Sequence, residues 1–276
     1  MNIAERTGTI STGPGELLDA SRPIVTLARD TAGRYFIPVH RHLRAQLVYA
    51  STGVLTVSTT EGRWVVPPQQ AVWVPAGTDH EVRSSGAVSM CSLYVDPSAA
   101  RELPIHCCVL TVPGLMRQLI LKAVSLPNEY GPGGPAARLM HVILDQLREL
   151  EPTPLHLPMP HDPRLKPMAD TLVANPADNR DLGTWAQSAG ASARTLARLF
   201  LKETGMTFGN WRQRLRLQAA VARLGAGQSV TTVAYDLGYQ SPSAFIAMFK
   251  RVLGAPPAHY FRLKPMSTNE KARTAH

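Results

Sequence analysis

The chain has 276 residues, 44% hydrophobic and 18% charged, which allows two domains with separate cores and excludes a wholly disordered protein. No run approaches the roughly 18–20 apolar residues of a membrane-spanning helix, and residues 1–18 lack a signal-peptide pattern, so we expect a cytoplasmic protein. Residues 1–161 hold 13 basic and 13 acidic side chains, whereas residues 162–276 hold 16 basic and 7 acidic ones. The second part therefore carries the whole net charge of +9, and we expect it to bind a polyanion.

Residues 21–112 are predicted to form a β domain, after a flexible N-terminus over residues 1–20. The β-branched and aromatic runs are separated by Gly, Pro, Ser and Asp, and lie at residues 46–51, 53–59, 63–68, 71–77 and 88–95. Their spacing of about ten residues is typical of an antiparallel sandwich or barrel.

Within this domain, residues 39–53 read VHRHLRAQLVYASTG and predict a strand with clustered polar groups. Side chains alternate between the two faces of a strand, so His40, His42 and Gln46 are expected to point into one space. Two imidazoles and an amide with this placement would form half of a metal site.

The same stretch resembles the two motifs of the cupin barrel. The first motif is Gly33-x6-His40-x-His42-x3-Gln46-x6-Gly53, with Gln46 where a glutamate is usual, and the second is Pro75-x-Gly77-x2-His80. The resemblance implies that His40, His42, Gln46 and His80 converge inside a barrel. Three imidazoles would suit zinc, nickel, iron or manganese, with the amide oxygen as a weak neutral ligand.

Three interpretations of these polar residues stay open from the sequence: a metal site, a metal-free effector pocket, and histidines satisfied by hydrogen bonds in the core. Tyr49, Trp64 and Trp73 are expected to line an effector pocket, although aromatic residues at strand spacing are also typical of an ordinary core.

Residues 113–151 predict a helical hairpin. Apolar residues recur at helical spacing in two segments, which contain Leu115, Met116, Leu119, Ile120 and Ala123, then Leu139, Ile143, Leu147 and Leu150. The apolar face would pack on the β domain or form a dimer contact. Residues 152–163 follow as a connector, and prolines at 152, 154, 158, 160 and 163 favour an extended chain there.

The basic half contains one helix-turn-helix unit twice, at residues 182–205 and 230–254. Ser192 and Ser241 lie 49 residues apart, and each is followed thirteen residues later by a glycine, Gly205 or Gly254. The serines are predicted to cap the second helix of each unit, and the glycines to end it in a left-handed conformation. Pro242 suits the first helical position of the second copy.

Residues 208–224 predict the helix that joins the two units, with a buried stripe of Trp211, Leu215, Ala219 and Ala222. Seventeen residues at 1.5 Å each span about 25 Å. Such a rod could hold two recognition helices about one turn of DNA apart, roughly 34 Å.

Residues 162–264 resemble the DNA-binding domain of the AraC/XylS family of transcription regulators. The resemblance rests on SARTLARLFLKETG, RLRLQAAVARL and VAYDLGYQSPSAFIAMFKRVLGAPPAHYF, which includes Gly254-x-x-Pro257-x-x-Tyr260. It implies a DNA-binding domain over residues 164–264, an operator in double-stranded DNA, a homodimer, and a small-molecule effector in the barrel. RNA polymerase is a further expected partner, and residues 265–276 would form a flexible tail.

The N-terminal residues of each second helix are the expected DNA contacts. In the first copy these are Ser192, Arg194, Thr195 and Arg198, and in the second they are Ser243, Ala244, Lys250 and Arg251. Arginine can bind guanine through O6 and N7, so the first helix is expected to read bases and the second to hold phosphates. Phosphate contact by both arginines is the alternative. Arg212, Arg214 and Arg216 are expected on a solvated helix face.

The predicted fold class is α+β with two domains, a cupin-like antiparallel barrel with a helical hairpin and an all-α double helix-turn-helix. The predicted function is sequence-specific transcription regulation, without catalysis. A cupin oxygenase or isomerase is the enzymatic rival, but the sequence offers no separate acid, base or nucleophile arrangement, and Gln46 replaces the usual anionic ligand. A constitutive architectural DNA-binding protein is the third alternative, and it would need no convergent polar groups.

Overall fold

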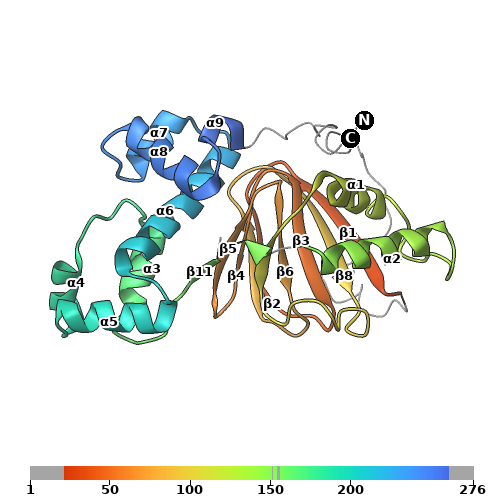
Figure 1. The fold of residues 1–276 in the computed structure, drawn as a ribbon, viewed down its shortest axis with the longest axis horizontal. Helices are drawn as coiled ribbons and strands as arrows, with labels where there is room; N and C mark the ends of the chain where they lie inside the picture. Colours follow the sequence, from red (N-terminus) through yellow and green to blue (C-terminus); the bar gives the residue numbers. More distant parts are fainter. Residues whose placement is uncertain (1–21, 151, 154–155, 261–276) are drawn as a thin grey trace, which may run out of the picture.

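A computed structural model describes residues 22–150, 152–153 and 156–260. The expected flexible termini, residues 1–20 and 265–276, lie outside the described residues. The N-terminal part is a β structure flanked by two helices, and the C-terminal part is helical (Figure 1). This arrangement confirms the predicted fold class. None of the described helices is long and apolar enough to cross a membrane.

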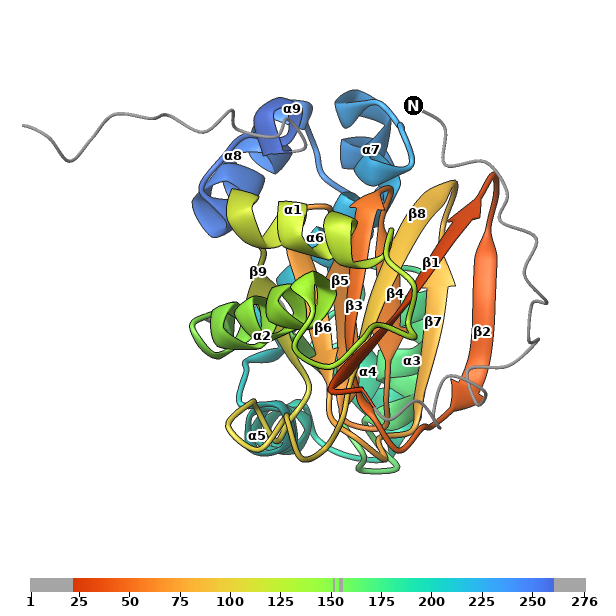
Figure 2. The ribbon, with the colours of Figure 1, turned by 90° about the vertical axis from the view of Figure 1, so that its right-hand side faces the viewer.

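The strands form two antiparallel sheets that face each other (Figure 2). In spatial order, the first sheet contains β1 (Ile24–Thr31), β8 (Val88–Val95), β3 (Ala45–Thr52), β6 (Gln70–Val74), β9 (Cys108–Thr111) and β10 (Pro152–Thr153). The second contains β11 (His156–Pro158), β5 (Gly62–Val66), β4 (Leu55–Ser58), β7 (His80–Ser84) and β2 (Tyr35–His40). Within the described residues β1 and β2 end their sheets without pairing to each other, so the barrel is open.

The expectation of one strand through residues 39–53 is wrong. Strand β2 ends at His40 and β3 begins at Ala45. Pro38 has no amide hydrogen to donate, which suits an edge strand, and the register of β2 shifts between Ile37 and His40. His42 lies in the connection between the strands, where its carbonyl oxygen accepts a hydrogen bond from the Gly77 amide at 2.9 Å.

Helices α1 (Gly114–Ala123) and α2 (Pro135–Arg148) form the predicted hairpin, and they cover the outer face of the first sheet (Figure 2). Met116, Ile120, Met140 and Ile143 are fully or almost fully buried in one apolar cluster with residues of β3, β6 and β8. The hairpin therefore packs on its own sheet. Leu115 and Val142 remain exposed on its outer side.

The proline-rich connector contributes short extended segments to both sheets. Strand β10 pairs with β9, and β11 pairs with β5. The chain between the two parts of the molecule is therefore attached to the β structure at these positions.

The C-terminal part consists of helices only in its described residues. They are α3 (Lys166–Ala174), α4 (Leu182–Ala189), α5 (Ala193–Thr204), α6 (Phe208–Gly225), α7 (Val230–Asp236), α8 (Pro242–Leu253) and α9 (Pro257–Tyr260). Helices α4 and α5 form the first helix-turn-helix, and α7 and α8 form the second.

The predicted end signals of α5 and α8 are confirmed. The Ser192 hydroxyl accepts a hydrogen bond from the Thr195 amide at 3.1 Å, and the Ser241 hydroxyl accepts one from the Ala244 amide at 3.2 Å. Gly205 and Gly254 end these helices with φ of 66° and 77°, in the left-handed region that favours glycine.

Helix α6 joins the two units and also packs on the β structure. Trp211 and Leu215 are buried as predicted, but Ala219 and Ala222 are only half-buried. In the second half of α6 the buried residues are Leu217, Gln218, Ala220 and Val221. The stripe differs from the prediction because α6 lies against β5, where the Gln218 side chain donates a hydrogen bond to the Arg63 carbonyl oxygen at 3.0 Å.

Candidate functional site

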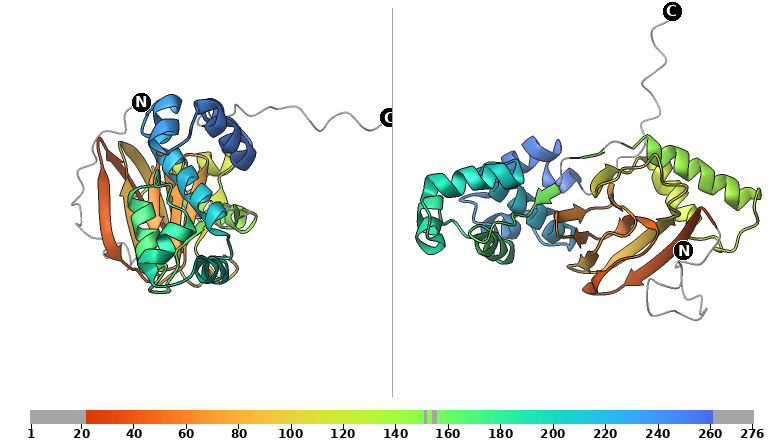
Figure 3. Two further views of the ribbon diagram at one scale, coloured as in Figure 1. Left: turned by 90° about the vertical axis from the view of Figure 1, so that its left-hand side faces the viewer. Right: turned by 90° about the horizontal axis from the view of Figure 1, so that it is seen from below.

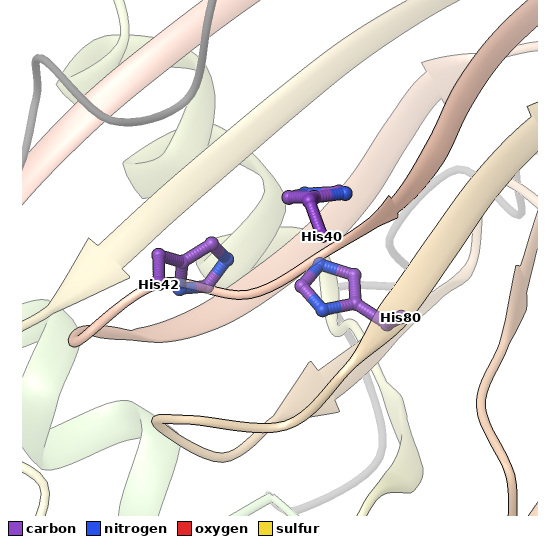
Figure 4. Close-up of side chains that lie close together, drawn as sticks. All are labelled: His40, His42 and His80. Atoms are coloured by element: carbon purple, nitrogen blue, oxygen red, sulfur yellow. The ribbon is translucent and has the colours of Figure 1, made fainter.

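Three histidines converge between the two sheets. His40 ends β2, His80 begins β7, and His42 lies in the connection to β3. Their potential ligand atoms lie within 4.8 Å of one another, and Figure 4 shows the rings meeting from these three segments. His80 is fully buried and His42 nearly so, while His40 is half-buried. We call these residues, together with Gln46, the histidine site.

Backbone carbonyl oxygens fix the roles of the ring nitrogens. Nδ1 of His40 lies 2.9 Å from the Pro38 carbonyl oxygen, and Nδ1 of His80 lies 2.8 Å from that of Thr78. Nδ1 of His42 bonds to the Arg44 carbonyl oxygen in the same way. A carbonyl oxygen can only accept, so each Nδ1 carries a hydrogen and each neutral ring presents a lone pair at Nε2.

Gln46, buried on β3, connects two of the histidines to the opposite wall of the barrel. Its Oε1 lies 3.0 Å from His42 Nε2 and 3.1 Å from His80 Nε2. Its Nε2 donates to the Ser92 hydroxyl at 2.9 Å and to the Tyr94 hydroxyl at 3.1 Å, both on β8. Every polar end of this amide thus has a neighbour within hydrogen-bonding distance.

Burial keeps the two inner imidazoles neutral near pH 7. It lowers the pKa of His80 to about 4, and it also lowers the pKa of His42 below the ordinary histidine value. With both Nδ1 atoms protonated, the neutral rings aim Nε2 lone pairs at the Gln46 oxygen. Three acceptors around one point repel one another unless something positive lies among them.

Two arrangements remove this repulsion. A metal ion can sit among the acceptors, because imidazole nitrogens and an amide oxygen are donors that divalent transition metals accept. Alternatively, a reversed Gln46 amide would donate its hydrogens to the imidazoles and accept from Ser92 and Tyr94. The donor set therefore fits a divalent metal and is also satisfiable without one.

The three aromatic residues expected around an effector are not brought together. Trp64 lies on the same face of its sheet as His80, because Trp64 is the register partner of Val57 and Val57 that of Val82. Tyr49 and Trp73 lie on the opposite face from Gln46, where they pack beneath α1 and α2. Tyr49 is an odd-numbered residue of β3, so it lies on the other face from Gln46. Trp73 on β6 is the register partner of Leu47 and shares that outer face, so neither residue shares the space of the histidines.

Sequence reasoning missed Ser92 and Tyr94, the partners of the Gln46 amide. The strand VSMCSLYV gives them the same parity, so the pattern could have placed both on one face. Their contact with Gln46 depends on the register Gln46–Tyr94 and Val48–Ser92, which has no local signal. His156 on β11 was also missed, since its strand is short and proline-rich.

The expected DNA-contacting residues lie on two separated helices. Helices α5 and α8 lie at opposite ends of α6 and on the same side of the molecule (Figures 2 and 3). Two helices with this placement can reach successive turns of one face of a duplex.

The exposed positions on the two helices differ in chemistry. Arg194 and Arg198 are exposed on α5, whereas Ser192 and the half-buried Thr195 bond to each other through their hydroxyls at 2.9 Å. On α8 the four expected DNA contacts, Ser243, Ala244, Lys250 and Arg251, are all exposed. The four cations of these two helices are Arg194, Arg198, Lys250 and Arg251. Within the described residues none of them forms an ion pair with a carboxylate, so their charges are available to DNA phosphates or bases.

Three arginines in the first half of α6, at positions 212, 214 and 216, are not on a solvated face, contrary to the prediction. Arg212 donates to the Arg180 carbonyl oxygen at 2.9 Å, and Arg214 donates to that of His156 at 3.2 Å. Arg216 donates to the Pro176 carbonyl oxygen at 2.8 Å and to the Asn179 side chain at 2.7 Å. All three are half-buried and hold α6 to neighbouring segments, which the sequence spacing could not indicate.

Comparison with known proteins agrees with this division of the chain. Residues 23–149 match the family model of an AraC-like ligand binding domain, and residues 185–263 match that of a helix-turn-helix domain. The transcriptional regulator NimR of Escherichia coli is 39% identical over 223 residues, which cover 81% of each chain. The regulator RipA of Corynebacterium glutamicum is 38% identical over 109 residues, which cover 40% of this chain and 32% of RipA. A solved structure of ToxT from Vibrio cholerae aligns with 88% of this chain and all of that chain, at 10% identity and a TM-score of 0.37.

A β sensor domain joined to two helix-turn-helix units defines a transcription regulator that binds DNA and carries its own ligand-binding domain. The similarity to NimR extends through both parts of the chain. The chain belongs to the AraC family of helix-turn-helix transcription regulators.

Proposed function

We propose that the sensor domain binds a divalent transition metal at the histidine site and that its occupancy, together with a small-molecule effector, sets the affinity of the regulator for its operator. The observation that carries this proposal is the common arrangement of the three imidazoles. Each Nδ1 bonds to a backbone carbonyl oxygen, which is the usual second contact of a metal-binding histidine, so each neutral ring presents its Nε2 lone pair.

The donor set favours zinc, nickel, iron or manganese, because imidazole nitrogen suits these ions. His40, His42 and His80 would supply the nitrogens, and Gln46 Oε1 a weak fourth ligand. The ligating nitrogens, within 4.8 Å of one another, would move closer to meet one ion. All four ligands are neutral, so the bound ion would keep its charge and could accept an anionic or carbonyl group of an effector at an open position.

We propose a sensing role, without turnover, for this site. The polar neighbours of Gln46 are Ser92 and Tyr94, and burial raises the pKa of Tyr94 to about 12. A phenol with that pKa is a poor proton donor or acceptor near pH 7. The neutral Gln46 also supplies none of the negative charge that would hold a catalytic metal tightly.

The functional units follow the predicted boundaries in this proposal: a sensor over residues 21–112, a hairpin over 113–151, a connector over 152–163 and a DNA-binding domain over 164–264. Exposed Leu115 and Val142 on the hairpin would contribute to a homodimer contact. Two protomers would then place four recognition helices on one operator, where the regulator could also contact RNA polymerase.

We assign base reading chiefly to Arg194 and Arg198 and phosphate contact to Ser243, Lys250 and Arg251. Exposed arginines four residues apart on α5 share one face and can form paired hydrogen bonds with guanine. Ala244 leaves the corresponding part of α8 without a long donor.

Metal content of the purified full-length protein tests the proposal. We expect about one zinc ion per chain after dialysis against zinc, and loss of this ion in His80→Ala. His141→Ala is the matched control, because His141 lies exposed on α2 away from the site. Gln46→Glu should raise zinc affinity about 10-fold or more, since a carboxylate adds negative charge to an otherwise neutral ligand set.

Equal zinc content in His80→Ala and the native protein would contradict the metal site. Absence of metal from both, with an effector still changing operator affinity, would favour the reversed Gln46 amide and a metal-free pocket.

A further inference from the structure

Strand β11 lies between the sensor core and the first helix-turn-helix, and its successive side chains enter different cores. His156 faces the inside of the β structure, where its ring stacks on Trp64 with centroids 4.8 Å apart and planes 11° from parallel. Leu157 is fully buried on the other side, in a cluster with Leu165, Trp211 and Leu215. One residue of this strand thus packs on the sensor and the next on the DNA-binding part.

A continuous row of side chains joins His156 to the histidine site. His80 and Val82 share one face of β7, Val82 is the register partner of Val57 on β4, and Val57 is that of Trp64 on β5. Trp64, Val57 and Val82 belong to one buried cluster. With strands about 4.8 Å apart, the row from β7 to β11 spans roughly 14 Å.

The other side of β11 is bonded to α6. The Pro158 carbonyl oxygen accepts a hydrogen bond from the Trp211 indole at 2.7 Å, and the His156 carbonyl oxygen accepts one from Arg214 at 3.2 Å. Since α6 separates the two recognition helices, a shift of β11 would displace the element that sets their spacing.

The β11–β5 contact has little spare room. A Cβ atom on Gly62 would lie 2.3 Å from Nε2 of His156 and 2.7 Å from the Leu157 carbonyl oxygen. In the described residues the Trp64 indole nitrogen and His156 Nε2 are buried without a hydrogen-bond partner. Stacking on Trp64 and a hydrogen bond between the His156 ring and the Glu61 backbone hold His156 against the sensor, and the stacked ring responds to movement of Trp64.

We infer that the Trp64–His156 stack transmits the state of the histidine site through β11 to α6, and so changes the affinity of the recognition helices for DNA. This inference rests on the proposed function, because it takes metal occupancy of the histidine site as the signal. Trp64 and His156 act as positioning residues and need not touch the metal or DNA.

The test uses the full-length protein, zinc ion as the probe, and an operator duplex selected from genomic fragments. The measured quantity is the ratio of operator dissociation constants for zinc-loaded and chelator-treated protein. We expect the native ratio to differ from one by about fivefold or more. Trp64→Leu and His156→Ala should bring this ratio to about one while zinc binding is kept.

Two variants control for loss of folding. His156→Phe keeps a stackable ring and should retain most of the native ratio. Trp73→Leu removes an indole of the same size from the outer face of the first sheet, beneath α1 and α2, and should leave the ratio unchanged. A native-like ratio in both Trp64→Leu and His156→Ala would overturn the inference, and so would a native protein that binds zinc without any change in operator affinity.

A native protein that binds no zinc would refute the proposed metal site, and hydrogen exchange then tests the link without metal. His156→Ala should speed amide exchange in residues 208–218 of α6 by about tenfold or more relative to Trp73→Leu. Unchanged exchange would show that the stack does not position α6 and would overturn the inference separately.

Discussion

Gln46 illustrates how much of the sensor depends on one side chain. Its two polar ends contact His42, His80, Ser92 and Tyr94, so its orientation decides whether the imidazoles meet an oxygen or an amide hydrogen. A buried amide in a closed network is costly to leave unpaired, and the network therefore has two satisfied states, one with a cation and one with the amide reversed. A site with two satisfied states is suited to switching.

At the same scale, Arg194 and Lys250 should make different contributions to DNA binding. Arg194→Ala is expected to cost about 1–3 kcal/mol on the best operator and to relax specificity at one base position, since a base contact is lost. Lys250→Ala should weaken binding similarly on all sequences and reduce the salt dependence by about one phosphate contact. Binding titrations on base-substituted duplexes at several salt concentrations measure both effects. Full discrimination by the Arg194 variant would contradict the base-reading assignment.

At the scale of elements, local signals set the ends of the recognition helices. Serine side chains satisfy amides at the start of α5 and α8, and left-handed glycines end both helices. These interactions span three or four residues, so they need no tertiary partner. The second helix of each copy accordingly begins and ends at matching positions.

Two glycines near the junction of α5 and α6 should respond oppositely to alanine. Gly205 has φ of 66° with nothing within 4 Å of an added Cβ, so Gly205→Ala should lower the free energy of unfolding by about 1 kcal/mol through backbone strain alone. Gly209 lies within α6, also in open space, and Gly209→Ala should raise it by up to about 1 kcal/mol. Chemical unfolding of the full-length variants measures both changes. Stabilisation by Gly205→Ala would contradict the strained C-cap.

At the scale of the whole molecule, the DNA-binding part is packed against the sensor rather than attached by a free linker. The side chain of Gln69 in the β5–β6 turn donates to the Tyr260 carbonyl oxygen at 2.9 Å, and Gln218 on α6 bonds to the Arg63 carbonyl oxygen. These contacts, one on α6 and one at the end of α9, restrict how far the helical part can rotate. A change inside the sensor can therefore bias the placement of the recognition helices.

If zinc occupies the histidine site as proposed, this packing would make metal binding and operator binding reciprocal. Whatever factor zinc removal causes in operator affinity, operator duplex should cause the same factor in zinc affinity, because both ligands act on one equilibrium. Coupling of this kind is typically about 5- to 150-fold. Zinc titrations with operator, with a random duplex and without DNA measure the factor, and two unequal factors would exclude a single linked equilibrium.

The residues of the histidine site were predictable from the sequence, but their arrangement on one strand was not. The motif spacing predicted that His40, His42, Gln46 and His80 come together, although residues 39–53 do not form the single strand assumed for them. The connection between β2 and β3 returns the chain so that His42 still faces Gln46. Parity along β3 separates Tyr49 from Gln46, and the register of β6 with β3 places Trp73 on the same outer face, so the expectation that both line the pocket is not met.

The sequence by itself determined the class of protein, the order of its elements and the ends of its recognition helices. Hydrophobic periodicity, capping residues and the internal repeat are local properties, so they are readable without knowing what packs against them. Only the tertiary structure decided that Ser92 and Tyr94 are partners of Gln46, that Arg212, Arg214 and Arg216 form internal bonds, and that β11 lies between two cores. Those contacts join residues 32 to 155 positions apart, and such pairings depend on sheet register and on the packing of α6, which leave no local signal in the chain.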